Sequence, residues 1–332
     1  MTAPPVLRAG RDDEADAYIA LIGACWAEYP GNVMDVDGEL PELRALASYF
    51  AQQGGALWSA EQAGRLVGMV ATRPLGEGAW ELCKMYATPG QRGSGLAQTL
   101  IGTAEDFARA HGGTRIKLWT DTRFDRAHRF YEKQSYVRFG PLKVHNDLSN
   151  SIEFAYAKPL AGVVVERLDA AGAVSAEFRL GEILRACVDA GASVSYLPPL
   201  APATAASFWR KASGAVAQGT RVLLAAWADG VLAGTVMLDL DMSPNQPHRA
   251  DVQKLLVHPN IRRRGLARLL MDRLEQEART VGRNLLTLDT REGDTAEAIY
   301  AASGWTRAGS IPGFTLNPDL TLDGTVIFWK QV

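Results

Sequence analysis

The sequence is poor in the features that mark several large classes of protein. Its 332 residues include three cysteines and five histidines, and neither type has the spacing of a metal site or a disulfide framework. The longest apolar runs, such as 222–227, fall far short of the roughly 18 residues that a membrane-spanning helix needs. A formal net charge of −2 offers no basic footprint for nucleic acid or an acidic membrane. We therefore expect a metal-free protein with neither nucleic acid nor membrane as a partner.

The N-terminus and the overall composition narrow the class further. Residues 1–5 have neither the basic start nor the apolar stretch of a secretory signal, which favours a cytoplasmic location. Hydrophobic residues make up 47% of the chain and charged residues 22%, the balance of a soluble globular protein. The chain is about twice as long as a common domain, which predicts two domains.

The sequence repeats itself once. An acidic residue, a lysine three positions later and a proline eight positions later occur in 81–89 and again in 251–259, at an offset of 170 residues. At the same offset Arg92, Gly95, Leu96, Ala97, Leu100, Glu105 and Ala108 match Arg262, Gly265, Leu266, Ala267, Leu270, Glu275 and Ala278. Chance does not give so many matches in order. The sequence therefore predicts two copies of one domain, 1–160 and 161–332.

Both copies predict the same order of helices and strands. In the first copy we expect strands at 6–9, 56–60, 66–72, 116–119 and 152–157, with helices at 12–28, 40–53 and 95–109. In the second copy the strands are expected at 163–168, 222–227, 232–238, 285–288 and 326–329, with helices at 172–189, 203–216 and 265–281. A further strand in each copy ends at Pro89 or Pro259, and a short helix carries Tyr131 or Tyr300. The strand–loop–helix–strand core predicts an α/β fold with a mixed sheet.

The segment between the repeated strand and the following helix is the candidate ligand site. In both copies, 91–97 and 262–267, it combines glycine with arginine. Small residues let a ligand approach the backbone, and the free N–H groups of a first helical turn bind anions. We infer a phosphate or pyrophosphate site, although the spacing fits neither a Walker loop nor the dinucleotide fingerprint. The alternative is that the glycines only begin helices and the arginines are solvated, and the recurrence of the whole pattern argues against it.

With this loop the sequence resembles the GNAT superfamily of N-acetyltransferases. The motif stands as Arg92-x-x-Gly95-x-Ala97 and Arg262-x-x-Gly265-x-Ala267. The second copy also resembles the tabtoxin-resistance-type branch in 195–200, 244–249, 254–259, 286–290 and 312–314. The resemblance implies two tandem domains, each a mostly antiparallel sheet with a parallel, splayed central pair flanked by helices. The first copy departs from the family pattern at Ser135, where the second copy has Gly304.

The resemblance also implies acetyl-CoA as the acetyl donor. Its pyrophosphate is expected on Arg92, Gly93, Ser94, Gly95, Leu96 and Ala97 in the first copy and on Arg262, Arg263, Arg264, Gly265, Leu266 and Ala267 in the second. Its pantetheine arm is expected to pair with the backbone of Met85, Tyr86 and Ala87 or of Leu255, Leu256 and Val257. Both copies are therefore expected to bind the cofactor, with the second as the principal catalytic site.

Acetyl transfer to an amine needs a base for the ammonium group and an acid for the leaving thiolate. Tyr300 and Tyr131 stand where the family motif places the acid. Candidate bases are Asp251 and Glu81, which begin the repeated strands, and Asp289, which ends the next strand of the second copy. Each of these acids could instead cap a turn or pair with an arginine, and water could carry the proton.

The sequence favours a small-molecule primary amine as the acceptor, because no docking surface for a protein is visible. Two alternatives stay open: a protein or peptide N-acetyltransferase, and a CoA-binding sensor without catalysis. The sequence does not identify the acceptor or the oligomeric state.

Overall fold

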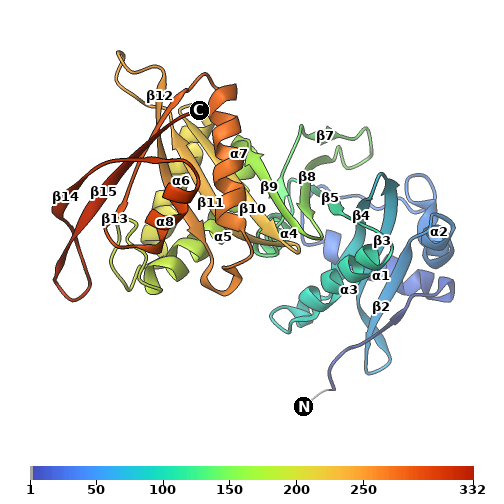
Figure 1. Ribbon diagram of the computed structural model, residues 1–332. Helices are drawn as coiled ribbons and strands as arrows, with labels where there is room; N and C mark the ends of the chain where they lie inside the picture. The colour runs from blue at the N-terminus through green and yellow to red at the C-terminus, as the bar shows by residue number, and fades with distance from the viewer. Residues whose placement is uncertain (1–2) are drawn as a thin grey trace. The chain divides into compact units, whose positions relative to one another are not determined.

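The computed structural model describes residues 3–332, apart from the side chain of Thr295, and forms two compact units (Figure 1). The first unit comprises Met1–Tyr131 and Arg138–Ala161, and the second comprises Glu132–Val137 and Gly162–Val332. The predicted boundary between 160 and 161 lies beside the last of these junctions. No pattern in the sequence indicated that the short segment Glu132–Val137 belongs with the second unit. Among the described residues, no helix is long and apolar enough to cross a membrane.

The first unit contains a mixed sheet in the order β1-β2-β3-β4-β5-β8-β6, with β7 paired to β8. Its strands are β1 (Val6–Ala9), β2 (Ala56–Gln62), β3 (Arg65–Gly76), β4 (Ala79–Ala87), β5 (Arg115–Asp121), β6 (Val137–Arg138), β7 (Lys143–Val144) and β8 (Ile152–Pro159). Its helices are α1 (Ala15–Trp26), α2 (Leu46–Gln52), α3 (Leu96–Ala110) and α4 (Asp125–Lys133). Strands β4 and β5 run parallel and pair over Ala79–Glu81 against Arg115–Lys117, beyond which they diverge.

The second unit has the same plan, with a sheet in the order β14-β15-β13-β12-β11-β10-β9. Its strands are β9 (Val163–Leu168), β10 (Arg221–Ala228), β11 (Val231–Asp239), β12 (Arg249–Val257), β13 (Leu285–Arg291), β14 (Thr306–Leu316) and β15 (Leu322–Gln331). Its helices are α5 (Ala170–Asp189), α6 (Pro202–Ala217), α7 (Leu266–Thr280) and α8 (Thr295–Ala302). Strands β12 and β13 are the parallel pair, joined over Arg249–Asp251 and Leu285–Thr287. The two mixed sheets confirm the expected fold class.

Helices cover both faces of the second sheet (Figure 1). Leu224 and Val236 pack on the face covered by α7, while Leu223 and Met237 pack on the face covered by α5 and α6. Because both faces are buried, strand β10 has a continuous apolar sequence rather than an alternating one. The layered core holds β12 and β13 in place up to the point where they diverge.

Strand β14 is the main element that the sequence did not predict. Most of its residues are exposed, and it contains Gly309, Pro312 and Gly313. Its pairing with β15 is interrupted by register shifts between Arg307 and Gly309 and between Ile311 and Thr315. An exposed strand with irregular pairing has no alternation of apolar and polar residues, so periodicity could not reveal it.

The departure from the repeat at Ser135 has a backbone consequence. Ser135 has φ +69°, and Gly304, its counterpart, has φ +77°. Only glycine adopts this left-handed region without steric cost, so Ser135 is strained. Its carbonyl accepts a hydrogen bond of 3.0 Å from Nε1 of the buried Trp227, which helps to hold the backbone there.

We expect Ser135→Gly to raise the free energy of unfolding by about 0.5–1 kcal/mol, because relief of the left-handed strain outweighs the added flexibility of the unfolded chain. Ser135→Ala keeps the Cβ atom and is the matched control, with no gain expected. Urea unfolding of the three proteins measures the difference. Equal gains for both variants would mean that the hydroxyl, and not the backbone, carries the cost.

Candidate active site

A large cavity opens in the second unit where β12 and β13 diverge. Its volume is about 1360 Å³, and it lies between the end of α5, the second half of β12, the start of α7 and helix α8. The edge of β12 is irregular here, because the register with β11 shifts next to Lys254, which has φ +54°. The parallel pair therefore ends in a slot with backbone on both sides, at the carboxyl ends of the strands.

The loop before α7 forms one end of this cavity. Gly265 has φ +78°, and a Cβ atom placed on it would meet nothing within 4 Å. The first intrahelical hydrogen bond runs from Leu269 N to Gly265 O at 3.1 Å. The N–H groups of 266–268 therefore have no partner within the helix, and the positive end of the helix dipole is at the same place.

Arginines surround this open backbone. Arg262, Arg263 and Arg268 line the cavity beside Gly265. Arg264 turns away to form an ion pair of 2.6 Å with Asp229. Free amides, an open glycine and several guanidinium groups together fit a pyrophosphate group well.

Tyr300 lines the same cavity from α8. Its ring packs near Trp305 and Phe328, with centroids 6.0 and 5.7 Å away, and the residue is 6% exposed. Burial raises the pKa of Tyr300 to about 12, and the nearby carboxylates of Asp294 and Asp289 act in the same direction. The phenol therefore stays protonated at neutral pH and can donate a proton.

Asp289 lies on β13, where the cavity meets a smaller pocket of about 360 Å³. Its Oδ2 accepts a hydrogen bond of 3.1 Å from Thr325 Oγ1. Among the described residues no arginine or lysine forms an ion pair with this carboxylate. A carboxylate that faces a cavity and forms no ion pair is suited to accept a proton or to hold an ammonium group.

Asp251 lies outside the lining of the cavity. It pairs with Arg249 at 3.2 Å and accepts a hydrogen bond from Thr287 Oγ1, which joins the parallel section of β12 and β13. The structure therefore brings together the loop before α7, Tyr300 and Asp289. It places Asp251 in the paired section of β12 and β13, outside the cavity.

Lys254 is a cavity residue that the sequence analysis did not single out. Its Nζ lies 3.3 Å from Ser195 Oγ and above the rings of Tyr196 and Phe208. Burial lowers its pKa, whereas the charge of Asp289 acts in the opposite direction. The repeat of this lysine as Lys84, also with positive φ, was the available signal.

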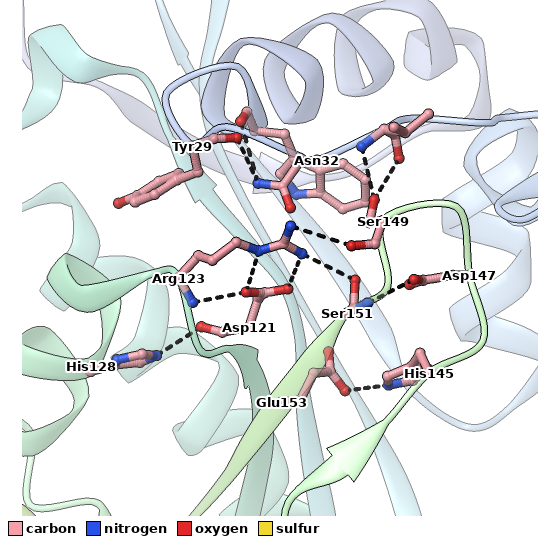
Figure 2. Close-up of polar contacts among 12 residues, drawn as sticks. Tyr29, Asn32, Asp121, Arg123, His128, His145, Asp147, Ser149, Ser151 and Glu153 are labelled. Atoms are coloured by element: carbon pink, nitrogen blue, oxygen red, sulfur yellow. Dashed lines mark hydrogen bonds and ion pairs between the residues drawn. The ribbon is translucent and has the colours of Figure 1, made fainter.

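In the first unit, Glu81 and Asp121 each form an ion pair with an arginine. Glu81 forms an ion pair of 2.6 Å with Arg73. Figure 2 shows Arg123 directed at the carboxylate of Asp121, at 2.5 Å, and reaching toward the loop with Ser149 and Ser151. Burial of Asp121 opposes ionisation, but the hydrogen bonds from Arg123 outweigh it and lower the pKa of Asp121. Asp121 is therefore not poised as its counterpart Asp289 is, whereas Glu81 is held in an ion pair just as its counterpart Asp251 is.

The loop before α3 in the first unit has the same backbone conformation as the loop before α7 in the second, and Tyr131 is the counterpart of Tyr300. Gly95 has φ +88° and begins α3, as Gly265 begins α7. Ser94 Oγ accepts the amide of Leu96 at 3.2 Å, so one N–H group of this turn is already satisfied. Tyr131 is buried, which raises its pKa.

Both halves of the chain match the model of a known family. A family model described as "Acetyltransferase (GNAT) family" matches 20–136 and again 193–305. An uncharacterized N-acetyltransferase from the hisH-hisA intergenic region of Azospirillum brasilense is 29% identical over 157 residues, which is 45% of this chain and 88% of the relative. N-acetyltransferase 8F1 of Rattus norvegicus is 29% identical over 31% of this chain, and the match spans 46% of the relative, about half its length.

Solved structures of acetyltransferases are also similar to this chain, at low identity. An acetyltransferase from Streptococcus agalactiae is 23% identical, with a TM-score of 0.42 over 47% of this chain and 99% of that structure. The structure of yncA from Salmonella typhimurium with its cofactor acetyl-CoA is 17% identical, with a TM-score of 0.43 over 51% of this chain and 94% of that structure. The family model carries the conclusion, since its two matches together cover more than half of the sequence. The chain belongs to the GNAT family of acetyltransferases, with one copy of the family domain in each half.

Proposed function

We propose that the protein transfers an acetyl group from acetyl-CoA to the primary amine of a small molecule, with its active site in the second unit. The observation that carries this proposal is the single cavity that contains the anion-binding loop, the protonated Tyr300 and the unpaired Asp289. The cofactor is that expected of GNAT acetyltransferases. We also retain 1–160 and 161–332 as the two proposed domains. The resemblance to the tabtoxin-resistance-type branch stays a prediction.

The second unit offers a place for each part of the donor. The amides of Gly265, Leu266 and Ala267, with Arg262 and Arg263, would hold the pyrophosphate, and Arg264 would add charge from its position beside Asp229. The exposed edge of 255–257 on β12 would pair with the amide groups of the pantetheine arm. When bound, acetyl-CoA supplies an activated thioester. The residues of the slot then orient it and exclude water.

The chain's own groups can move both protons of the reaction. Asp289 takes a proton from the acceptor's ammonium group, directly or through water, so that the amine becomes nucleophilic. The C–N bond forms at the acetyl carbonyl, the C–S bond breaks, and Tyr300 gives its proton to the departing sulfur. Backbone N–H groups at the irregular edge of β12 can stabilise the oxygen that becomes negative.

The acceptor is proposed to enter the smaller pocket beside Asp289. Tyr196, Leu197, Pro198, Phe314 and Leu316 form an apolar part of its wall, and the rest is polar, with Ser193, Ser195, Asp289, Arg291, Thr315 and Asn317. A volume of about 360 Å³ suits a small molecule better than a folded protein. An amine that carries both apolar and polar groups fits this mixed lining, with its charged end at Asp289.

The cytoplasmic location also stays a proposal. Its support is that Cys25, Cys83 and Cys187 are all free thiols, as is usual in a reducing compartment.

A screen of small primary amines with acetyl-CoA, read by release of free thiol, tests the function directly. Acetylation of peptides alone, or binding of CoA without turnover of any acceptor, would replace the proposal with one of the two alternatives from the sequence.

Tyr300→Phe is expected to lower kcat by about 10- to 1,000-fold and to leave the affinity for acetyl-CoA nearly unchanged. The ring keeps its packing, while the proton for the sulfur must then come from water. Tyr131→Phe is the matched control and is expected to have a much smaller effect. Steady-state kinetics and calorimetry separate the two quantities. A wild-type kcat in the Tyr300 variant would remove this residue from the mechanism.

Asp289→Asn is expected to lower the rate at pH 7 by about 10- to 1,000-fold, and the defect should shrink as the pH rises. Free amines titrate near about 10, so at high pH the acceptor no longer needs a base. Asp251→Asn is the comparison, because its carboxylate also stood as a candidate base. A pH–rate profile that changes in the Asp251 variant and not in the Asp289 variant would reverse the assignment.

Gly265→Glu is expected to abolish CoA binding by the second unit, because a carboxylate would enter the space meant for the pyrophosphate. The substitution also strains the backbone, so a control with the same strain is needed. Gly282, at the other end of α7, has φ +73° and equally open surroundings. Gly282→Glu should lower stability similarly and keep CoA binding in calorimetry. Loss of binding in both variants would make strain the cause.

A further inference from the structure

In each unit, a cysteine near the end of the first helix forms a hydrogen bond with the last residue of the central strand. Cys25 Sγ donates a hydrogen bond of 3.5 Å to Ala87 O, and Cys187 Sγ donates one of 3.4 Å to Val257 O. Ala87 and Val257 occupy the same place in the repeat, as the last residues of β4 and β12. The residues that follow each cysteine can therefore be compared position by position.

The two units differ in the size and charge of the side chains that follow the cysteine. In the second unit the third and fourth positions after the cysteine are Ala190 and Gly191, and both line the cavity. In the first unit the same positions are Glu28 and Tyr29. Small residues leave the groove of the second unit open, whereas the first unit has a charged and an aromatic side chain there.

Glu28 binds the arginine of the cofactor motif. Its carboxylate lies 2.5 Å from Arg92 Nη2 and 2.9 Å from Arg126 Nη1, so it bridges the loop before α3 and helix α4. The hydrogen bond from Arg92 lowers the pKa of Glu28, and the carboxylate is therefore charged at neutral pH. A negatively charged group already sits where the motif arginine would meet a pyrophosphate.

Tyr29, the next residue, packs against the segment before α4. Its ring centroid lies 4.7 Å from that of Phe124, just before α4. Trp26 Nε1 donates a hydrogen bond of 3.0 Å to the hydroxyl of Tyr86 on β4. The chain after Tyr29 continues the connection, since Val33 N donates to Ser149 Oγ at 2.8 Å, and Figure 2 shows this segment meeting the loop before β8. The end of α1 is thus joined to β4, to the segment before α4 and to the loop before β8.

We propose that Glu28 and Tyr29 close the cofactor groove of the first unit, with the Glu28 carboxylate in the place of the ligand's pyrophosphate. The wild-type chain then binds one cofactor, in the second unit. This inference rests on the proposed function for the identity of the ligand, and it revises the expectation that both copies bind CoA. In this proposal Glu28 and Tyr29 are the reason that the cofactor groove is open in the second unit alone.

The test exchanges these residues between the units. Glu28→Ala combined with Tyr29→Gly gives the first unit the small residues of the second, and Ala190→Glu gives the second unit the acid of the first. Calorimetry with CoA is expected to find one site in the wild type, two in the double variant and none in Ala190→Glu. An exposed ion pair contributes little on its own, and Glu28→Gln leaves Tyr29 in place. We therefore expect Glu28→Gln to raise the CoA affinity of the first unit by roughly 10-fold, which is less than the effect of the double variant.

Gly95→Glu added to the double variant must return the count to one, because it blocks the loop of the first unit. Two sites in the wild type would overturn the proposal, as would an unchanged single site in both the double variant and Glu28→Gln. Circular dichroism checks the folding of the double variant, and Glu28→Gln keeps the Tyr29 packing if that variant fails to fold. A second site that survives Gly95→Glu would also overturn it.

The outcomes separate this proposal from the proposed function. A wild type that binds one CoA but acetylates no amine would contradict the function and leave the closed groove intact. A wild type that binds no CoA, with one site in the double variant, would support closure of the first unit and contradict the assignment of the second.

Discussion

The divergence of one parallel pair of strands sets the position of every part of the site in the second unit. Every other pair with a defined register in the second unit is antiparallel, so among the described strands of that unit β12 and β13 alone have neighbouring carboxyl ends that face the same way. Their three-residue pairing, reinforced by Asp251 and Thr287, sets where they separate. The loop before α7, Tyr300 and Asp289 are all placed relative to that point, which explains why two short motifs far apart in sequence share one cavity.

The repeat made most of the fold predictable, because the core elements are strongly periodic or continuously apolar. The expected helices and strands of both copies occur within a few residues of their ranges, except that the helix expected at 40–53 is divided into a 3₁₀ helix over Pro41–Ala45 and the α-helix α2 over Leu46–Gln52. What periodicity could not provide was the pairing of exposed β14 or the membership of Glu132–Val137 in the second unit. Both depend on contacts with distant segments rather than on local pattern.

The site was only partly visible in the sequence for a similar reason. The motif located Arg262, Gly265 and Tyr300 because their chemistry is local. Whether an acid is free depends on its neighbours in space: the same Asp-Thr-Arg triplet yields an ion pair at Asp121 and none at Asp289. Likewise, Asp251 begins the repeated strand, yet its partners on β12 and β13 hold it away from the cavity.

The chain passes between the units three times, after Tyr131, Val137 and Ala161, and this affects how the protein can be divided. A cut at residue 161 would yield a second half without the carbonyl of Ser135, so the indole N–H of Trp227, a fully buried side chain, would lose its acceptor. An unsatisfied buried donor typically costs about 1–3 kcal/mol. Val137 would also be missing from the core around α5 and α6. Duplication thus produced two halves that look like separable modules in sequence, while a strip of the earlier half is needed to complete the later one.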